Sequence, residues 1–142
     1  MNSGMTEKNV IFPWRDAYSV GIPEIDEQHK GLIRLINKLQ EAMLEGHGTS
    51  VLSGILDDLI RYTQSHFAFE EGMLRKRGYS QLAAHCAEHK RLTGEVAGLR
   101  DKFKNGKVTI SMEVMKFLKD WLATHILSRD QAYAKELNAE VA

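Results

Sequence analysis

Histidine and acidic residues recur in this chain at a spacing that places pairs of side chains on one face of a helix. His66 and Glu70 are four residues apart. The same spacing separates His85 from His89. Residues i and i+4 of a helix project from the same side about one turn apart, so each pair could bind one metal ion. Two further histidines and one further acidic residue complete a set that could hold two ions: His29, His125 and Asp130.

The number of bonds that this set offers leaves one position on the metal pair for an outside molecule. Five imidazoles, two bridging carboxylates and one bridging hydroxide form one bond fewer than two octahedral ions accept. An open position is where an exogenous ligand binds. Nitrogen donors with shared carboxylates favour iron or manganese, because zinc prefers four ligands per ion. The residues therefore predict a di-metal site that binds a small molecule.

Four amphipathic segments carry these ligands, each with the three- and four-residue spacing of a helix. Helices of about 20 residues joined by short loops pack as antiparallel neighbours. We therefore expect an all-α chain of one domain, residues 1–142, with an antiparallel up-down-up-down four-helix bundle over residues 23–130. Residues 1–22 should form an irregular N-terminal arm, and residues 131–142 a C-terminal extension too polar to add much core. The segments run from Pro23 to Gly46, from Ser50 to Gly78, from Ser80 to Asn105 and from Ser111 onward.

Local signals refine the ends of these helices. Ser50 and Ser80 are suited to be N-caps of the second and third helices, because a serine hydroxyl can accept a hydrogen bond from the first turn. Asp130 follows His125 by five residues, one more than the helical spacing provides. We expect the fourth helix to widen locally, or to end near residue 129, so that Asp130 turns inward.

Composition excludes several classes of function. Nineteen basic and nineteen acidic residues cancel, so no net charge attracts nucleic acid or an anionic membrane. No stretch approaches a membrane span, and residues 1–10 are polar and lack the apolar core of a secretion signal. Cys86 is the only cysteine, which precludes an intramolecular disulfide and fits a reducing compartment. We expect a cytoplasmic protein without stable membrane insertion.

The ligand segments, taken in order, make the chain similar to the bacterial hemerythrins. The resemblance extends from Trp14 to about Tyr133 and rests on VGIPEIDEQH (20–29), HFAFEE (66–71), HCAEH (85–89) and WLATHILSRD (121–130). All seven positions of the family's metal-ligand pattern carry the matching residue type. No single segment is specific, but the ordered set is.

The resemblance implies a non-haem centre of two iron ions, joined by an oxo or hydroxo bridge, that binds dioxygen reversibly. It implies that one ion is filled by His85, His89 and His125. The ion with the open position would be bound by His29 and His66, and the bridging carboxylates would be Glu70 and Asp130. It further implies an apolar oxygen pocket lined by Leu32, Phe67, Trp121, Leu122 and Ile126.

Four residues near these positions have less certain roles. Tyr133 and Tyr18 are candidates for polar contacts with the site, although ordinary packing is favoured for both. His47 lies between two glycines and matches no ligand position, so we expect it to be solvated. Cys86 points about 100° away from the neighbouring ligand on its helix, which favours an inert, partly buried thiol.

We expect a carrier or store of dioxygen that is not an enzyme and acts as a monomer, with an oxygen-consuming enzyme as a candidate recipient. One alternative is a sensor of oxygen, nitric oxide or iron that acts through a partner, since the sequence leaves no room for an output domain after Asp130. Another is a di-iron oxidase or peroxidase of the ferritin-like class. Such enzymes use Glu-x-x-His motifs, and this chain has none.

Overall fold

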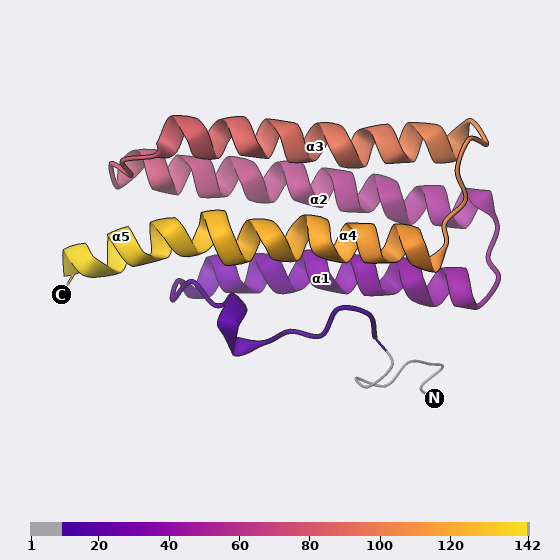
Figure 1. Ribbon diagram of the computed structural model, residues 1–142, viewed down its shortest axis with the longest axis horizontal. Coiled ribbons are helices and arrows are strands. Elements are labelled where there is room, and N and C mark those ends of the chain that lie inside the picture. The colour runs from indigo at the N-terminus through magenta and orange to yellow at the C-terminus, as the bar shows by residue number, and fades with distance from the viewer. Residues whose placement is uncertain (1–9, 142) are drawn as a thin grey trace.

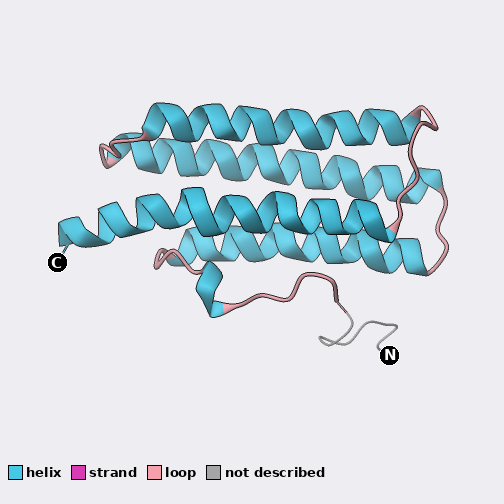
Figure 2. Ribbon diagram, viewed as in Figure 1, coloured by secondary structure: helices cyan, strands magenta, loops and turns pink. Residues whose placement is uncertain are grey.

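Four long helices run alternately up and down along one axis (Figure 1). The computed structural model describes residues 10–141 of the chain, and all regular structure in that range is helical (Figure 2). The helices of the bundle are α1 (Pro23–Leu44), α2 (Thr49–Lys76), α3 (Leu82–Lys104) and α4 (Met112–His125). This order confirms the expected up-down-up-down bundle. Residues 1–9, the polar start of the expected arm, lie outside the described residues.

The fourth helix continues beyond the bundle. After α4 the chain forms a π-helical turn, η3 (Ile126–Asp130), and then α5 (Gln131–Val141), which extends past the end of α1 (Figure 1). The described part of the N-terminal arm, residues 10–22, contains a short 3-10 turn, η2 (Asp16–Tyr18), and lies along α1 (Figure 1). The side-chain amide of Gln131 donates a hydrogen bond of 2.9 Å to the carbonyl oxygen of Ser19, which ties the arm to the start of α5.

Two of the expected helix caps are wrong. α2 begins at Thr49, so its N-cap is Gly48, and Ser50 lies inside the first turn. α3 has Gln81 at its N-cap position. Ser80 instead donates from its backbone N–H to Glu136 of α5, at 2.9 Å, and its hydroxyl bonds the same carboxylate. A carboxylate from a distant part of the chain thus replaces the local cap that the serine could have made.

The fourth helix starts where the sequence indicates. Ser111 is the N-cap of α4, and its hydroxyl accepts a hydrogen bond of 3.3 Å from the backbone N–H of Val114. α1 opens with Pro23, whose missing N–H costs nothing in a first turn. The loop after α1 contains Gly46 at φ 79°, a left-handed conformation that glycine adopts without a steric penalty.

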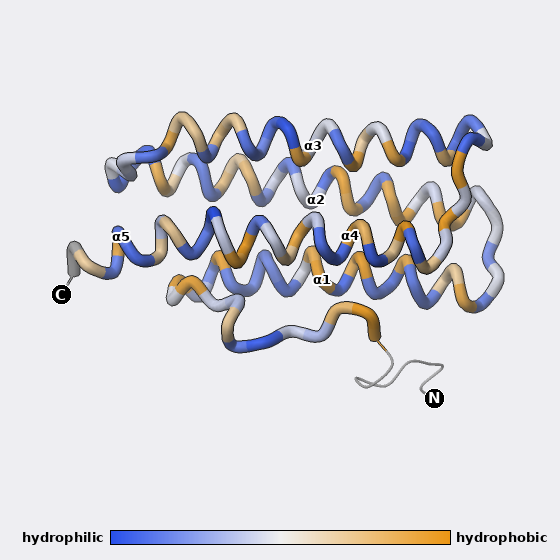
Figure 3. The backbone as a smooth tube through the Cα atoms, viewed as in Figure 1, coloured by the Kyte–Doolittle hydropathy of each residue, from blue (hydrophilic) through white to orange (hydrophobic). Residues whose placement is uncertain are grey.

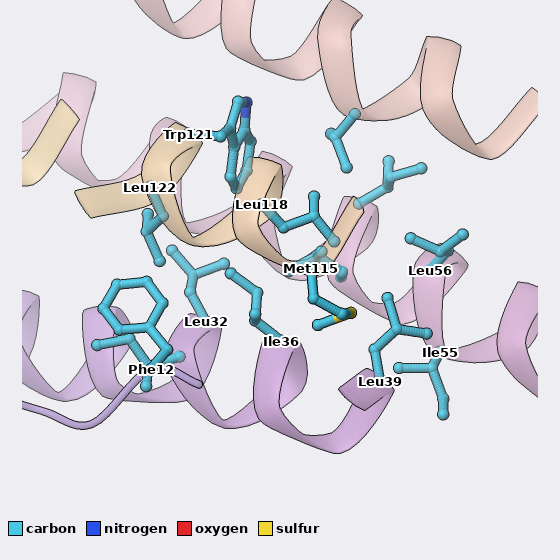
Figure 4. Packing of buried hydrophobic residues seen from close by; sticks show 14 of the residues in the cluster. Phe12, Leu32, Ile36, Leu39, Ile55, Leu56, Met115, Leu118, Trp121 and Leu122 are labelled. Carbon is cyan, nitrogen blue, oxygen red and sulfur yellow. The ribbon is translucent and has the colours of Figure 1, made fainter. Parts of the chain in front are cut away.

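Apolar residues from all four helices fill the centre of the bundle. Figure 3 shows apolar positions recurring along each helix, and Figure 4 shows side chains of α1, α2 and α4 meeting in the interior. Leu32, Ile36 and Leu39 of α1 are fully buried there, as are Met115 and Leu118 of α4. This core continues toward the end of the bundle that holds the predicted metal ligands.

The C-terminal extension adds more core than its composition suggests, which corrects the expectation that it is too polar to do so. Tyr133 and Leu137 of α5 are fully buried, and they pack in a second cluster with Ile25 of α1 and Leu74 of α2. The reason is positional. Because α5 continues the line of α4, its buried residues Tyr133, Ala134 and Leu137 pack against the end of the bundle and Val20 of the N-terminal arm.

A glycine in α1 permits close contact between the first two helices. A Cβ atom at Gly31 would overlap the hydroxyl and ring of Tyr62 on α2, whereas a Cβ atom at Gly54 would meet open space. We expect Gly31→Ala to lower the free energy of unfolding by about 1–3 kcal/mol, as overpacking does. Gly54→Ala, the matched control, should raise it by about 0.5–1 kcal/mol through helix propensity. Urea denaturation of both variants checks this, and stabilisation by Gly31→Ala would contradict the close contact.

Candidate metal centre

The seven predicted metal ligands come together in the interior, and every helix of the bundle contributes at least one. α1 provides His29, α2 provides a pair, α3 provides a pair, α4 provides His125 and η3 provides Asp130. None of the seven side chains is more than 2% exposed. The α2 and α3 pairs are His66 with Glu70 and His85 with His89.

Glu70 lies at the middle of the cluster. One of its carboxylate oxygens, Oε1, is 2.8 Å from Nε2 of His85 and 2.9 Å from Nε2 of His89. Its other oxygen, Oε2, is 3.5 Å from Nε2 of His66 and 3.7 Å from Nε2 of His29. Oε1 therefore faces the two histidines of α3, and Oε2 faces His66 of α2 and His29 of α1. A carboxylate that bridges two metal ions needs its two oxygens directed at different sets of ligands in this way.

Asp130 also directs its two carboxylate oxygens at different histidines. Its Oδ2 lies 3.0 Å from Nε2 of His29, and its Oδ1 lies 3.2 Å from Nε2 of His125 and 3.3 Å from Nε2 of His85. The π-helical turn makes this possible, because it adds one residue to the turn between His125 and Asp130. Of the two expected solutions, the helix widens and does not end.

The donor atoms form two overlapping groups of unequal size, each with its atoms within 4.8 Å of one another. The larger group contains five residues and the smaller group three, with Glu70 common to both. The larger group is Glu70, His85, His89, His125 and Asp130. The smaller group is His29, His66 and Glu70. Two ions at these positions would therefore receive different numbers of protein ligands.

Burial and the two carboxylates shape the electrostatics of the site. Burial alone would raise the pKa of Glu70, but contacts with His29, His85 and His89 hold it well below its usual range. Burial likewise favours a low pKa for His29, but Asp130 and Glu70 raise it to about 9. For His66 burial prevails and lowers the pKa to about 4. A buried pocket with two anionic carboxylates attracts cations.

Several buried polar atoms of the cluster lack any hydrogen-bond partner. Nε2 of His29, His66 and His125 and both carboxylate oxygens of Asp130 are in this state. An unpaired buried polar group costs on the order of 1–3 kcal/mol, so such a group of them needs a compensating interaction. Coordination of metal ions by these lone pairs supplies it. The donor set of imidazoles and carboxylates thus fits a pair of metal ions.

Three residues outside the ligand set hold individual ligands. The hydroxyl of Tyr133 donates a hydrogen bond of 2.8 Å to Oε2 of Glu70. Nδ1 of His66 is 2.6 Å from Oε1 of Gln28, and Nδ1 of His89 is 2.7 Å from Oε2 of Glu71. Sequence reasoning missed Gln28 and Glu71. Each stands next to a ligand in the sequence, but only the packing of neighbouring helices shows which histidine it meets.

The structure distinguishes the four residues near the ligand positions by their contacts and exposure. Tyr133 packs in the second core cluster and also donates a hydrogen bond to Glu70, so it makes the polar contact for which it was a candidate. Tyr18 packs edge-on against the rings of Phe12 and Trp14. His47 is exposed, and Cys86 is half-buried, as expected for both.

The five apolar residues expected around an oxygen pocket are all buried in the main core. The ring of Phe67 stacks on the ring of His89, with centroids 3.7 Å apart and an angle of 2° between the planes. Trp121 directs its indole N–H to the carbonyl oxygen of Leu92, at 3.1 Å. The other three, Leu32, Leu122 and Ile126, are at most 2% exposed. The surroundings of the cluster are therefore dry and apolar.

Comparison with known proteins decides the family. Residues 20–137 match the model of the hemerythrin HHE cation binding domain. The chain belongs to the hemerythrin family. Bacteriohemerythrin of Stenotrophomonas maltophilia is 38% identical, with 92% of this chain and 84% of the relative covered. Bacteriohemerythrin of Methylococcus capsulatus is 35% identical, with 91% of this chain and 98% of the relative covered.

Solved structures agree with this membership. A crystal structure of wild-type hemerythrin has a TM-score of 0.80 and 34% sequence identity to this chain, covering 88% of this chain and 96% of its own. The match confirms the resemblance that the ligand segments indicate. It also confirms the all-α bundle. Among residues 10–141, none of the helices has the length and hydrophobicity that a bilayer span requires.

Proposed function

We propose that this hemerythrin binds dioxygen reversibly at a pair of iron ions and serves as a carrier or store. The observation that supports this most is the unequal division of the ligands. Five residues surround one metal position, and three surround the other, where Oδ2 of Asp130, 3.0 Å from Nε2 of His29, would add a fourth ligand. A hydroxide shared by both ions would then leave one position on the second ion that the protein does not fill, and an open position is where an outside molecule binds.

The residues have distinct tasks in this proposal. His85, His89 and His125 would hold the first ion, and His29 and His66 would hold the second. Glu70 and Asp130 would be ligands of both. When bound, the iron pair supplies the electrons that dioxygen accepts and takes back on release. Tyr133 holds Glu70 in place through its hydrogen bond, at 2.8 Å.

The apolar side chains around the cluster exclude water and protons. Leu32, Leu122 and Ile126 are buried beside the ligand-bearing turns of α1, α4 and η3, and a dry site slows side reactions of a reactive ligand. We propose that these three residues, with Phe67 and Trp121, line the dioxygen pocket.

Turnover of a substrate is the less favoured function. The ferritin-like enzymes have carboxylate-rich sites with Glu-x-x-His motifs, whereas this site has five imidazoles and only two carboxylates. We propose that residues 1–142 form one hemerythrin-like domain. The monomeric state, the cytoplasmic location, an oxygen-consuming enzyme as recipient and the alternative of a partner-dependent sensor remain predictions.

Anaerobic loading with ferrous iron, followed by addition and removal of dioxygen, tests the proposed function. We expect two iron ions per chain and an absorption band that appears with dioxygen and disappears when it is removed, over several cycles. One ion per chain, or a band that never reverses, would overturn the carrier proposal. Catalytic oxidation of an added organic substrate would favour the enzyme.

A further inference from the structure

Two of the five ligand histidines have hydrogen-bond partners of different charge on their second ring nitrogen. His66 faces the neutral amide of Gln28, and His89 faces the carboxylate of Glu71. His66 belongs to the smaller donor group and His89 to the larger one. The charged partner therefore lies behind the ion that has more protein ligands, and the neutral partner behind the ion that has fewer.

We propose that Glu71 and Gln28 are positioning residues that make the two metal ions electronically unequal. The benefit of this inequality to a dioxygen carrier rests on the proposed function. The inequality itself applies to any pair of divalent metal ions bound in the site. A carboxylate that accepts the Nδ1–H bond increases the donor strength of the other imidazole nitrogen. A neutral amide fixes the tautomer and the ring orientation with much less electron donation.

Glu71 lies at the edge of solvent. Its side chain is 26% exposed, in contrast to the fully buried Glu70, and it lies on a groove of about 550 Å³ between α2 and α3. Lys90 also lines this groove. Charge at the edge of solvent avoids most of the desolvation cost that a second carboxylate inside the cluster would incur.

The geometry of His89 is held from two directions. Its ring stacks on Phe67 with centroids 3.7 Å apart, while Glu71 holds Nδ1 at 2.7 Å. Nε2 is then fixed toward Glu70, at 2.9 Å. Gln28 does the same for His66 from α1, at 2.6 Å from Nδ1, so that Nε2 faces the ligands of the smaller group.

In functional terms, stronger donation at the filled ion stabilises its oxidised state. The open ion, backed by a neutral amide, gives up an electron less readily when no ligand is bound. This division suits a carrier, because it supports electron transfer to a bound ligand without making both ions prone to spontaneous oxidation.

The test uses the full chain loaded with Co²⁺ and, separately, with iron. Glu71→Gln removes the charge behind His89, and Gln28→Glu adds one behind His66. Apoprotein titrated with Co²⁺ should bind two ions in each case. Glu71→Gln should lower the affinity for the ion at the larger donor group by about tenfold and leave the affinity for the other ion unchanged. Loss of a hydrogen-bond partner of a metal ligand costs about 10–100-fold in affinity. Gln28→Ala should instead lower the affinity for the ion at the smaller donor group.

Imidazole N–H spectra and the reduction potential distinguish an electronic effect of Glu71 and Gln28 from a purely structural one. In Co²⁺-loaded protein, the exchangeable imidazole N–H signal shifted by Glu71→Gln should differ from the one shifted by Gln28→Glu. In iron-loaded protein, Glu71→Gln should raise the reduction potential and Gln28→Glu should lower it. A tenfold change in a one-electron equilibrium corresponds to about 59 mV.

Substitutions elsewhere in the chain provide matched controls for these variants. Glu113→Gln and Asn105→Asp make the same charge changes at exposed positions away from the ligands, and neither should shift one ion selectively. Glu71→Asp, which keeps the charge, should retain most of the wild-type potential. The proposal is overturned if Glu71→Gln and Gln28→Glu shift the potential in the same direction, or no more than the controls. Failure of the iron form to bind dioxygen would overturn the proposed function alone.

Discussion

Replacing Glu70 with alanine is expected to abolish the oxygenated form of the protein. Glu70 is the only residue shared by both donor groups, and its two oxygens face histidines of different groups. Without it, the two ions lose a common ligand and the hydroxyl of Tyr133 loses its acceptor. The measurement is metal content per chain, together with the absorption spectrum after dioxygen is added. We expect fewer than two ions and no band.

A second substitution at the same position guards against a simple folding defect. Glu70→Gln keeps the volume of the side chain but removes the charge, and it should also bind fewer than two ions. Glu113→Ala, at an exposed position in the first turn of α4, is the control and should bind two ions normally. If either Glu70 variant gave the wild-type spectrum with dioxygen, Glu70 would not be a bridging ligand. His66→Ala should abolish the oxygenated form as well.

Truncation of Leu122 is expected to speed the spontaneous oxidation of the oxygenated form several-fold. Leu122 is 2% exposed and lies one turn before His125 in α4. Its loss would open space beside the ligands and admit water and protons, which accelerate departure of the bound gas in reduced form, as hydrogen peroxide, and leave the iron oxidised. The rate is measured as decay of the dioxygen band in air. An unchanged rate in Leu122→Ala would remove the argument for shielding.

Leu56→Ala separates shielding from lost stability. Leu56 is fully buried in the same core but lies in the first half of α2, ten residues before His66, and on the opposite side of the view in Figure 4 from Leu122. Either substitution should lower the free energy of unfolding by about 2–5 kcal/mol. Only Leu122→Ala should speed oxidation. Equal acceleration by both variants would show that general loosening of the core, and not local access of water, controls the decay.

The helices and the ligand set follow from local sequence. The three- and four-residue spacing of apolar residues predicts four helices, and the same spacing places His85 beside His89 before any packing is known. The five-residue step from His125 to Asp130 predicts an irregular turn, and the structure has one as η3. Local spacing could not decide whether the helix would widen or end there, because that depends on what α5 packs against.

Contacts between helices were beyond the reach of the sequence. Ser80 looked like a helix cap but bonds Glu136, 56 residues later. The polar end of the chain supplies Tyr133, which packs with Ile25 and holds Glu70. In each case the partner lies far away in the sequence.

The sequence by itself determined which residues could bind metal and on which face of each helix they lie, because helical periodicity is a local property of the backbone. Only the tertiary structure decided how the ligands divide into a group of five and a group of three, and which of them Gln28 and Glu71 support. Those relations depend on the rotation and register of one helix against another. Packing of the whole core sets that register.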